Sequence, residues 1–218
     1  MRRGADLIAE PRVDAAALVD HGWADLLAAE DHLLTEAKMV PEVIPNGTLH
    51  HATLENSVVD HLGLAGADLP RLEATDTVWT GCDLANADVG SASLLRVTFQ
   101  GCRLTGTVLA GGYLADVTFR DCQLEMVNLA ETTLKNVRFE RCRLVAATLD
   151  AARLKAVTFS DCDLDRASLA GLRLRGLDLR DCRFQTLEVE PGQLRGVIVT
   201  PQQAANLAVR VLGLDVRE

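Results

Sequence analysis

Six cysteines carry the most reactive side chains of this 218-residue sequence, and they recur at a constant interval of twenty residues. An even number of cysteines is compatible with disulfides, and cysteine with histidine is a common ligand set for zinc. However, the sequence contains neither a CxxC nor a CxxH motif. A constant interval of this length is typical of a repeat architecture, so the repeat must be analysed before the chemistry. The cysteines are Cys82, Cys102, Cys122, Cys142, Cys162 and Cys182.

Five histidines are the other side chains that could act as ligands or general bases. His50, His51 and His61 are close in the sequence, whereas His21 and His32 precede them. No Gly-rich phosphate loop, G-x-S-x-G or HExxH motif accompanies them. The sequence therefore predicts no catalytic residue, no metal site and no cofactor, and it favours a binding protein over an enzyme.

Every fifth residue from Leu49 to Val199 is apolar, which makes thirty-one positions without an interruption. Two residues before each of these positions lies a second column of mostly small residues, such as Ala52, Ala67 and Cys82. Neither a helix nor a regular strand has a period of five. The pattern predicts short extended segments that each point two side chains inward and then turn a corner.

A second period of twenty residues is superimposed on the first. It relates the aromatic residues Trp79, Phe99, Phe119, Phe139 and Phe159, as well as the six cysteines. Four pentapeptides per coil explain both periods, because residues twenty apart then stack on one side of a four-sided solenoid. Stacked strands are about 4.8 Å apart, so nearly eight coils predict a rod roughly 37 Å long.

This arrangement shows whether the cysteines and histidines could form disulfides or metal sites. Stacked cysteines would have Cα atoms about 4.8 Å apart but parallel Cβ directions, which suits neither a disulfide nor tetrahedral zinc. We therefore expect the six cysteines to be buried core residues, like the aromatic column. His51 and His61 are two pentapeptides apart, so they should lie on opposite sides of the coil and cannot share a metal.

The segments Ala67-Asp68-Leu69, Ala87-Asp88-Val89 and Val127-Asn128-Leu129 follow the A-[D/N]-L-x-x consensus of the pentapeptide-repeat family. The sequence resembles this family over about seven-tenths of its length. The resemblance implies an all-β solenoid, a right-handed quadrilateral β-helix. Within the family it resembles the loop-free, DNA-mimicking gyrase inhibitors of actinobacteria, since the register never breaks to accommodate a protruding loop.

Both ends of the chain depart from the repeat, and the sequence predicts three parts: an N-terminal helical cap or arm (1–46), the β-helix (47–200) and a C-terminal helix with tail (201–218). Asp14 resembles a helix N-cap and Gly22 a stop. Trp23, Leu26, Leu27, Leu33, Leu34 and Ala37 would then share one face of a helix that ends before Pro41 and Pro45. The segment could cap the first coil or bind a partner.

At the C-terminal end, Thr200-Pro201-Gln202-Gln203 is a capping box with proline at the first helical position. It predicts a helix from Pro201 to about Leu212 that Gly213 closes. Leu207, Val211 and Leu212 lie on its apolar side, either as a cap or as part of a homodimer interface. Dimerisation through this end is what the resemblance to gyrase-inhibiting relatives implies.

The net charge of −9 argues against direct binding of nucleic acid, and no apolar run suggests a membrane span or a signal peptide. We therefore expect a cytoplasmic protein with a protein partner. Residues 1–100 carry sixteen acidic and six basic side chains, so acid-driven recognition should use the early coils. An acidic stripe there would consist of Asp60, Asp68, Glu73, Asp76, Asp83 and Asp88.

Two functions remain open on these observations. The resemblance implies a DNA mimic that binds DNA gyrase or topoisomerase IV, either inhibiting the enzyme or protecting it from inhibitors and so conferring antibiotic resistance. The alternative is a scaffold or adaptor with an unknown protein partner. Arginines such as Arg103, Arg120, Arg141, Arg143 and Arg153 interrupt the acid surface, so the charges could also merely solvate a narrow rod.

Overall fold

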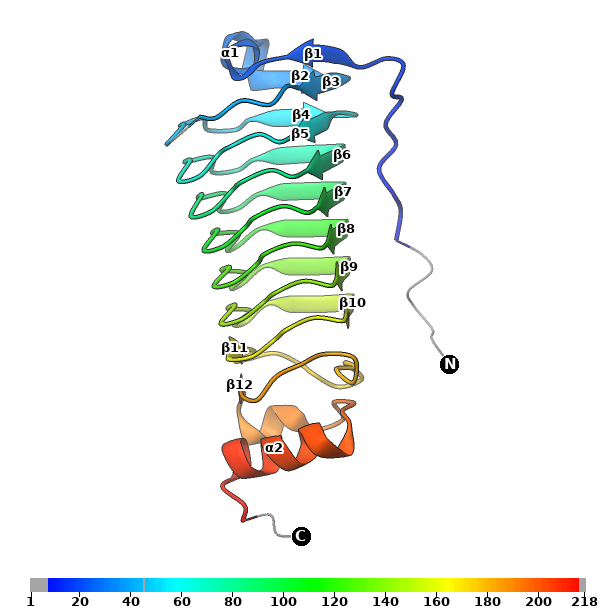
Figure 1. Ribbon diagram of the computed structural model, residues 1–218, viewed down its shortest axis with the longest axis vertical. Helices are drawn as coiled ribbons and strands as arrows, with labels where there is room; N and C mark the ends of the chain where they lie inside the picture. The colour runs from blue at the N-terminus through cyan, green and yellow to red at the C-terminus, as the bar shows by residue number, and fades with distance from the viewer. Residues whose placement is uncertain (1–7, 45, 216–218) are drawn as a thin grey trace.

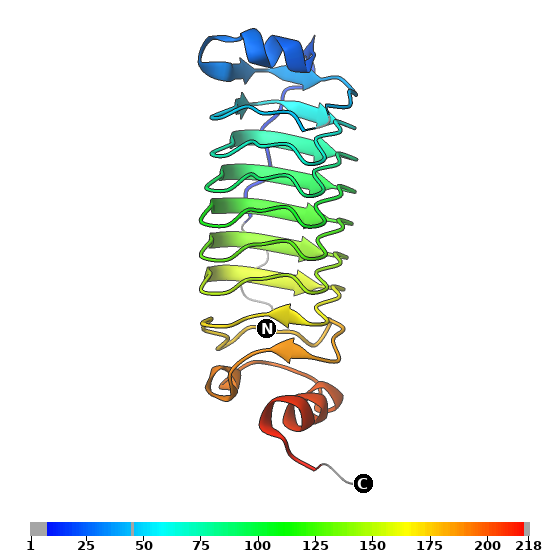
Figure 2. The same ribbon diagram turned by 90° about the vertical axis from the view of Figure 1, so that its left-hand side faces the viewer.

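The computed structural model describes residues 8–44 and 46–215, which form a long rod of about eight coils (Figures 1 and 2). One short helix lies at the N-terminal end of the rod and a longer one at the C-terminal end. The predicted right-handed quadrilateral β-helix is confirmed. No helix among the described residues is long and apolar enough to span a membrane.

Each corner of the coil is made by one residue in the left-handed backbone region, two positions after the inward leucine-like residue. Asp76, Asn86 and Arg96 have φ values of 53°, 56° and 53°, and Gly66 and Gly106 take φ values of 69° and 70°. Glycine, asparagine and aspartate adopt this conformation most readily. The recurrence of the left-handed corner every five residues is what closes a coil in four pentapeptides.

The coil has four faces, which we number by their central inward residues. Face 1 is centred on Leu54, Ala74, Leu94 and their equivalents twenty residues on, and face 2 on Val59, Trp79 and Phe99. Face 3 is centred on Leu64 and Leu84, and face 4 on Leu69 and Val89. Parallel pairing at an interval of twenty residues links successive coils on every face, for example Thr75↔Leu95, Val78↔Thr98, Asp83↔Arg103 and Asp68↔Asp88.

Faces 1 and 2 carry most of the strands. Strands β4 (Thr53–Glu55) and β5 (Val58–Asp60) are short, and each of the following strands runs through both faces without interruption. These longer strands are β6 (Glu73–Thr80), β7 (Ser93–Gln100), β8 (Tyr113–Arg120), β9 (Thr133–Glu140) and β10 (Arg153–Ser160). Two short strands, β11 (Ala167–Ser168) and β12 (Leu187–Glu188), pair on face 4 near the C-terminal end.

The core is a single column of inward side chains that runs the length of the rod. On face 2, the rings of Phe99, Phe119, Phe139 and Phe159 stack with centroids 5.0–5.1 Å apart, and Trp79 lies 5.7 Å above Phe99. Both predictions for the core, the aromatic stack and the buried cysteines, are confirmed. No coil could bury these residues alone, so coil-to-coil stacking is the source of stability.

The N-terminal region differs from the predicted helical arm. Asp14 caps a single turn, Gly22 begins rather than ends a helix, and α1 (Trp23–Ala28) is only six residues long. After a 3-10 turn, η2 (Glu30–His32), the chain forms β2 (Leu33–Thr35) and β3 (Ala37–Met39), which pair with β4 and β5. A third strand, β1 (Val19–His21), pairs with β3.

The reason for this difference is that Leu34, Met39 and Ile44 continue the five-residue series one coil earlier than predicted. Leu34 and Met39 are buried, and Ala37 fills the small position between them. A helix here would leave the backbone groups of β4 and β5 without partners at the end of the solenoid, whereas two more strands satisfy them. The apolar spacing of this segment fits both a helix and the repeat. Backbone pairing with β4 and β5 favours the strands over the helix.

The C-terminal helix α2 (Pro201–Leu212) has the predicted limits. Thr200 accepts a hydrogen bond from the Gln203 amide, and Gly213 adopts the left-handed conformation that closes the helix. A 3-10 turn, η3 (Pro191–Leu194), precedes it. Leu207 is buried against the last coil, so α2 covers the open end of the core.

Candidate functional site: the charged faces of the rod

The cysteine column lies at the start of face 3 and has no catalytic geometry. All six thiols are free and buried, and each donates to a carbonyl of the coil before it, as Cys102 does to Trp79 O at 3.4 Å. Burial and the neighbouring Cys162 raise the pKa of Cys182 to about 12. The pKa is also raised at Cys102, Cys122, Cys142 and Cys162, so these five thiols stay protonated near neutral pH. A hydrogen bond with Cys102 lowers the pKa of Cys82, but that side chain is 1% exposed, and an attacking thiolate must be accessible. The column is therefore a source of packing and hydrogen bonds.

The histidines of the first coils occupy different corners. His51 lies at the corner between faces 4 and 1 and contacts the Arg71 guanidinium at 2.8 Å. His61 lies at the corner between faces 2 and 3, where its ring is 2.7 Å from the Asp60 carboxylate. Across the residues that the structure describes, no three His, Cys, Asp or Glu side chains are placed to hold a metal ion.

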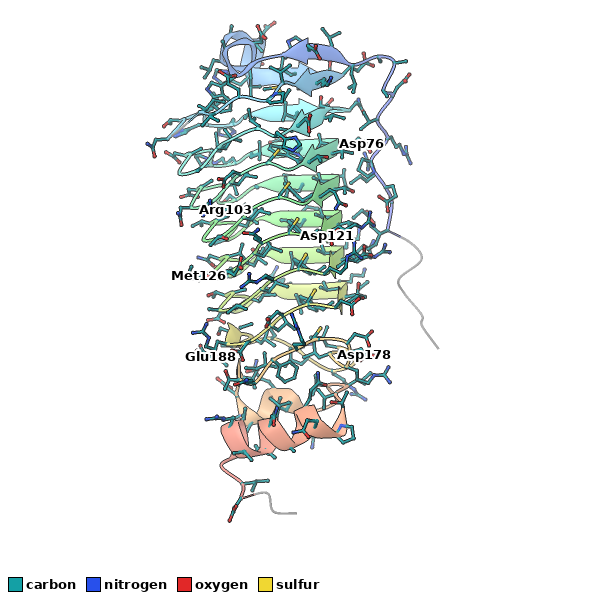
Figure 3. The ribbon with its side chains drawn as sticks, in the orientation of Figure 1. Asp76, Arg103, Asp121, Met126, Asp178 and Glu188 are labelled. Carbon is teal, nitrogen blue, oxygen red and sulfur yellow. The ribbon has the colours of Figure 1, made fainter. Side chains whose placement is uncertain are left out.

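The six acidic residues predicted to form one stripe are distributed around the rod. Asp68 and Asp88 share face 4, and Asp83 lies on face 3, where Arg103 is 3.3 Å away. Figure 3 shows Asp76 on the side along which the N-terminal segment runs, and Arg103 on the opposite side. The remaining two are Asp60 on face 2 and Glu73 on face 1. Adjacent positions in the sequence belong to adjacent faces, so the early acids cannot form a single stripe.

Faces 2 and 3 carry acids and bases that neutralise one another between coils. On face 2 and its corner with face 3, Arg120 pairs with Glu140 at 2.8 Å, and Arg141 with Asp121 at 2.6 Å. The arginine partner lowers the pKa of Asp121 to about 2. Face 3 is balanced in the same way, with Glu125 3.1 Å from Arg143. These interstrand pairs leave little net charge for a partner.

Face 4, with its corner, is different because its charges are almost all acidic. From residue 48 to residue 191 it carries six carboxylates and one guanidinium, Arg71, a balance of −5. The neighbouring outward positions are small, for example Gly90, Ala110, Ala130 and Ala170, so the carboxylates stand on a smooth surface. The acidic residues of face 4 are Asp68, Asp88, Glu131, Asp150, Glu188 and Glu190, all exposed except the half-buried Asp150.

Sequence reasoning missed four of these six residues, although the signal was present. Sorting the outward positions by their place in the twenty-residue coil, rather than by their nearness in the sequence, separates face 4 from the others. The structure adds that face 4 lies opposite the N-terminal segment: Figure 3 shows Glu188 on the far side of the rod from Asp76 and Asp121. Face 4 is therefore the candidate functional surface.

The N-terminal segment itself was not anticipated from the sequence. Residues 8–14 run along the outside of the rod, beside the corner between faces 1 and 2 (Figure 1). The amide of Arg12 donates to Asp76 at 3.0 Å and the amide of Ala9 donates to Asp116 at 3.4 Å. The Arg96 guanidinium binds the same Asp76 carboxylate at 2.6 Å and lowers the pKa of that group. A ladder of corner side chains therefore holds this segment.

The apolar residues of α2 divide between two surfaces. Leu207 is buried and Val211 packs partly against the core, so both serve as the cap. Leu212 is 48% exposed, and Val209 and Leu214 are also exposed at this end of the rod. The helix thus covers the core and still presents an outward apolar edge.

Comparison with known proteins agrees with the repeat geometry. A family model described as a pentapeptide repeat region matches residues 72–149 and 132–203. The chain belongs to the pentapeptide-repeat family. No curated protein matches the sequence significantly.

Two of the solved structures that match the chain do so at low sequence identity. A trypsin-treated variant of QnrB1, a plasmid-mediated fluoroquinolone resistance protein, is 20% identical with a TM-score of 0.47, over 85% of this chain and 90% of its own. HetL, involved in heterocyst differentiation regulation in the cyanobacterium Nostoc, is 18% identical with a TM-score of 0.35. That match covers 77% of this chain and 89% of HetL. At such identities the likeness concerns the fold alone.

Proposed function

We propose that this pentapeptide-repeat protein is a non-enzymatic binding protein whose face 4 imitates a nucleic-acid strand toward a basic protein groove. The observation that carries the proposal is the row of carboxylates on face 4, from Asp68 to Glu190, with Arg71 as the one basic side chain among them. Its surface is otherwise small and uncharged, so a partner could contact the acids without steric obstruction. The N-terminal segment lies on the opposite side and leaves this face open.

The charge density supports imitation of one strand rather than of a duplex. Asp68 and Glu188 are separated by six coils, or about 29 Å at 4.8 Å per coil. One strand of B-DNA carries a phosphate every 3.4 Å along the axis, about eight over this length, and the duplex about seventeen. Six carboxylates approach the first number and fall far below the second. We infer that face 4 presents one edge of a DNA-like surface.

The partner proposed for this surface is a type II topoisomerase, DNA gyrase or topoisomerase IV, and the protein would inhibit the enzyme or protect it from inhibitors. The resemblance to the loop-free gyrase-inhibiting members of the family suggests this partner, and a gyrase partner would place the protein in the cytoplasm. An adaptor that binds another protein through the same face is the alternative. The two differ in whether DNA competes for the binding site.

A supercoiling assay with purified gyrase tests the proposal. The wild-type protein should inhibit supercoiling at micromolar concentration, or should restore supercoiling in the presence of a fluoroquinolone. The triple variant Asp68→Asn, Asp88→Asn and Glu131→Gln should lose at least ten-fold in potency. A matched control, Asp60→Asn, Asp161→Asn and Asp181→Asn, removes the same charge from face 2 and its corner and should behave as wild type. No effect of the wild type, or equal losses in both triples, would overturn the proposal.

We also propose that two copies associate through the C-terminal end of the rod. Val209, Leu212 and Leu214 form an exposed apolar edge there, beyond the residues of α2 that cap the core. Leu212→Asp should convert a dimer to a monomer in sedimentation analysis. Val19→Asp, which changes an exposed valine at the other end of the rod, should not. A wild type that sediments as a monomer at 100 µM contradicts this part of the proposal.

A further inference from the structure

The C-terminal half of face 1 carries a cluster of basic side chains that the acidic composition of the chain conceals. From residue 133 to residue 195 its outward positions hold six basic residues and no acid. Five of the six are exposed, and none of them makes an ion pair with any described residue, unlike the arginines of faces 2 and 3. The six are Lys135, Arg153, Lys155, Arg173, Arg175 and Arg195; we call them the basic cluster.

The basic cluster is arranged by the repeat into columns of like charge. Lys135 and Lys155 are direct partners in the register of β9 and β10, and Arg175 and Arg195 follow at the same position of the next two coils. Like charges directly opposite each other on neighbouring strands are destabilising. The parallel ladder of faces 1 and 2 also ends here, because no backbone hydrogen bond joins β10 to residues 173–180 in the described part of the chain.

Folding alone therefore does not account for the basic cluster, since neighbouring coils on faces 2 and 3 instead hold pairs of opposite charge, such as Arg120 with Glu140 and Arg103 with Asp83. A ligand with several negative charges would bridge the columns and remove their repulsion. The flanking positions are small, namely Ala151, Ala156, Gly171, Gly176 and Gly196, so that a broad ligand could lie directly on the basic side chains.

In a symmetric pairing through face 1, a second copy of this chain does not supply enough negative charge. The acids that face 1 offers at its N-terminal end are Glu36, Glu55 and Glu73, because Asp76 and Asp116 already bind Arg96 and the N-terminal segment. In an antiparallel pairing of two copies through face 1, three acids would meet six bases on each side. The excess positive charge would oppose this symmetric association. A contact between the basic cluster of one copy and face 4 of another would be head-to-tail and need not close, so an external polyanion is the better match.

Among polyanions, a nucleic-acid strand fits better than an acidic peptide. An acidic peptide would contact the exposed basic side chains through its own side-chain carboxylates. It would have to order one flexible side chain for every contact. Phosphates are linked by their own backbone, and binding releases condensed counterions. The basic cluster spans three coil steps, or about 14 Å, which corresponds to about four phosphates of one strand that keeps the 3.4 Å rise of a stacked helix.

We propose that the basic cluster of face 1 binds the phosphate backbone of single-stranded nucleic acid. The acidic face 4 is adjacent around one corner, where it disfavours a duplex that would extend across that corner. This site is separate from the topoisomerase-binding surface proposed on face 4, so the two proposals can succeed or fail independently. The protein would carry a surface that imitates nucleic acid beside one that binds it.

Fluorescence anisotropy with a labelled 20-nucleotide oligo-dT tests this proposal. At 50 mM salt the wild type should bind, and the logarithm of the binding constant should fall with the logarithm of the salt concentration with a slope of about −3, as for four contacts to a single strand. The triple variant Lys155→Ser, Arg175→Ser and Arg195→Ser should bind at least ten-fold more weakly. The control triple Arg166→Ser, Arg183→Ser and Arg210→Ser removes the same charge elsewhere and should retain wild-type affinity.

Several results would overturn the proposal. These are no binding of the oligonucleotide at 100 µM protein, equal weakening in both triples, or tighter binding of a duplex than of the single strand. Competition by a poly-glutamate peptide at lower concentration than by oligo-dT would assign the basic cluster to an acidic protein instead. Self-association that only the first triple abolishes would assign it to a second copy. The unfolding midpoint of the first triple should be no lower than that of the wild type, because its changes relieve repulsion between like charges. The control triple should unfold close to the wild type, so that loss of binding is not loss of fold.

Discussion

Arg96 lies one coil beyond Asp76, and its guanidinium holds the Asp76 carboxylate at 2.6 Å while the backbone amide of Arg12 donates to the same carboxylate at 3.0 Å. One buried carboxylate thus joins two coils of the rod to a segment that is more than sixty residues away in the sequence. Asp116 repeats the arrangement two coils further on, where Ala9 donates to it and Asn136 contacts it at 3.0 Å. The N-terminal segment follows this ladder along the corner between faces 1 and 2.

Replacing Asp76 with asparagine should therefore lower stability and release the N-terminal segment. The Asp76 side chain is 8% exposed and that of Arg96 is 22% exposed. We expect a loss of about 1–3 kcal/mol in the free energy of unfolding, less than for a fully buried ion pair. Urea unfolding measures the loss, and hydrogen exchange should show faster exchange of the Arg12 amide. The exposed Asp161→Asn provides a control that should change neither quantity.

The same pair predicts a pH dependence. Hydrogen bonding to Arg96 lowers the pKa of Asp76 below the value of about 3.9 that applies to the unfolded chain. A lowered folded-state pKa stabilises the protein above the unfolded pKa, and this stabilisation is lost as the pH falls through the folded one. The difference in unfolding free energy between wild type and Asp76→Asn should hence be largest at pH 6–7 and should shrink below about pH 4. A difference that grows on acidification would contradict this assignment.

The aromatic stack should contribute far more to stability than an exposed aromatic residue on the same strand. Phe119 is fully buried between Phe99 and Phe139, whereas Tyr113 on the same strand β8 is 43% exposed. Phe119→Ala should cost about 3–5 kcal/mol, because it leaves a cavity between two rings that cannot collapse onto each other. Tyr113→Ala should change the unfolding free energy by about 0.5 kcal/mol or less. Denaturant unfolding of the two variants gives the comparison, and similar losses in both would show that the stack is not a main source of stability.

The parts of the structure that could be predicted from the sequence are those where the five-residue period is the only pattern that the apolar residues fit. Phe99 and Phe119 had to stack because every inward position between them keeps the period of five. At residues 23–39, two periods compete, since Leu34 and Ala37 fit a helix as well as a coil, and the choice depends on backbone pairing with β4 and β5. Pairing with a distant partner leaves no local signature.

The candidate surface was predictable only in part for a related reason. Asp68 and Asp88 were identified, but they were grouped with Asp60 and Asp83, which the corners of the coil place on other faces. Grouping by the twenty-residue period would also have revealed Glu131 on face 4. The contact of Arg12 with Asp76 could not have been predicted in this way, because the N-terminal segment has no repeat and binds through its backbone.

The cysteines provide a test of coil integrity through their reactivity. All six are buried, and Cys182 in the last coils is the most accessible at 5% exposure. Burial raises the pKa of Cys182 to about 12, so only a small fraction of the protein carries a thiolate at this residue at pH 8. A disulfide reagent should modify the folded protein roughly 100-fold more slowly than the unfolded chain, with Cys182 reacting first. Mass spectrometry of partly modified protein identifies the site, and early labelling of Cys122 would imply that the rod opens in its middle.

The last coil depends on one side chain of the capping helix. The side-chain amide of Gln203 donates hydrogen bonds to the carbonyl oxygens of Leu179 and Cys182, both at 2.8 Å. In the coils before it, the backbone of the following coil takes this position. Gln193 makes the corresponding pair of bonds to Leu169 and Leu172 ten residues earlier. Two glutamines therefore complete two corners that lack a following coil, one between faces 4 and 1 and one between faces 2 and 3.

Gln203→Ala should expose the consequence of removing such a bond pair. It leaves two buried carbonyl groups without a donor, which costs about 1–3 kcal/mol each when water cannot replace the lost partner. We expect a lower unfolding midpoint together with faster hydrogen exchange that is confined to residues 179–207. Gln202→Ala alters the exposed neighbour in the same turn and should leave both measurements unchanged. If Gln203→Ala were neutral, water would be able to reach these carbonyls, and α2 would be attached through Leu207 alone.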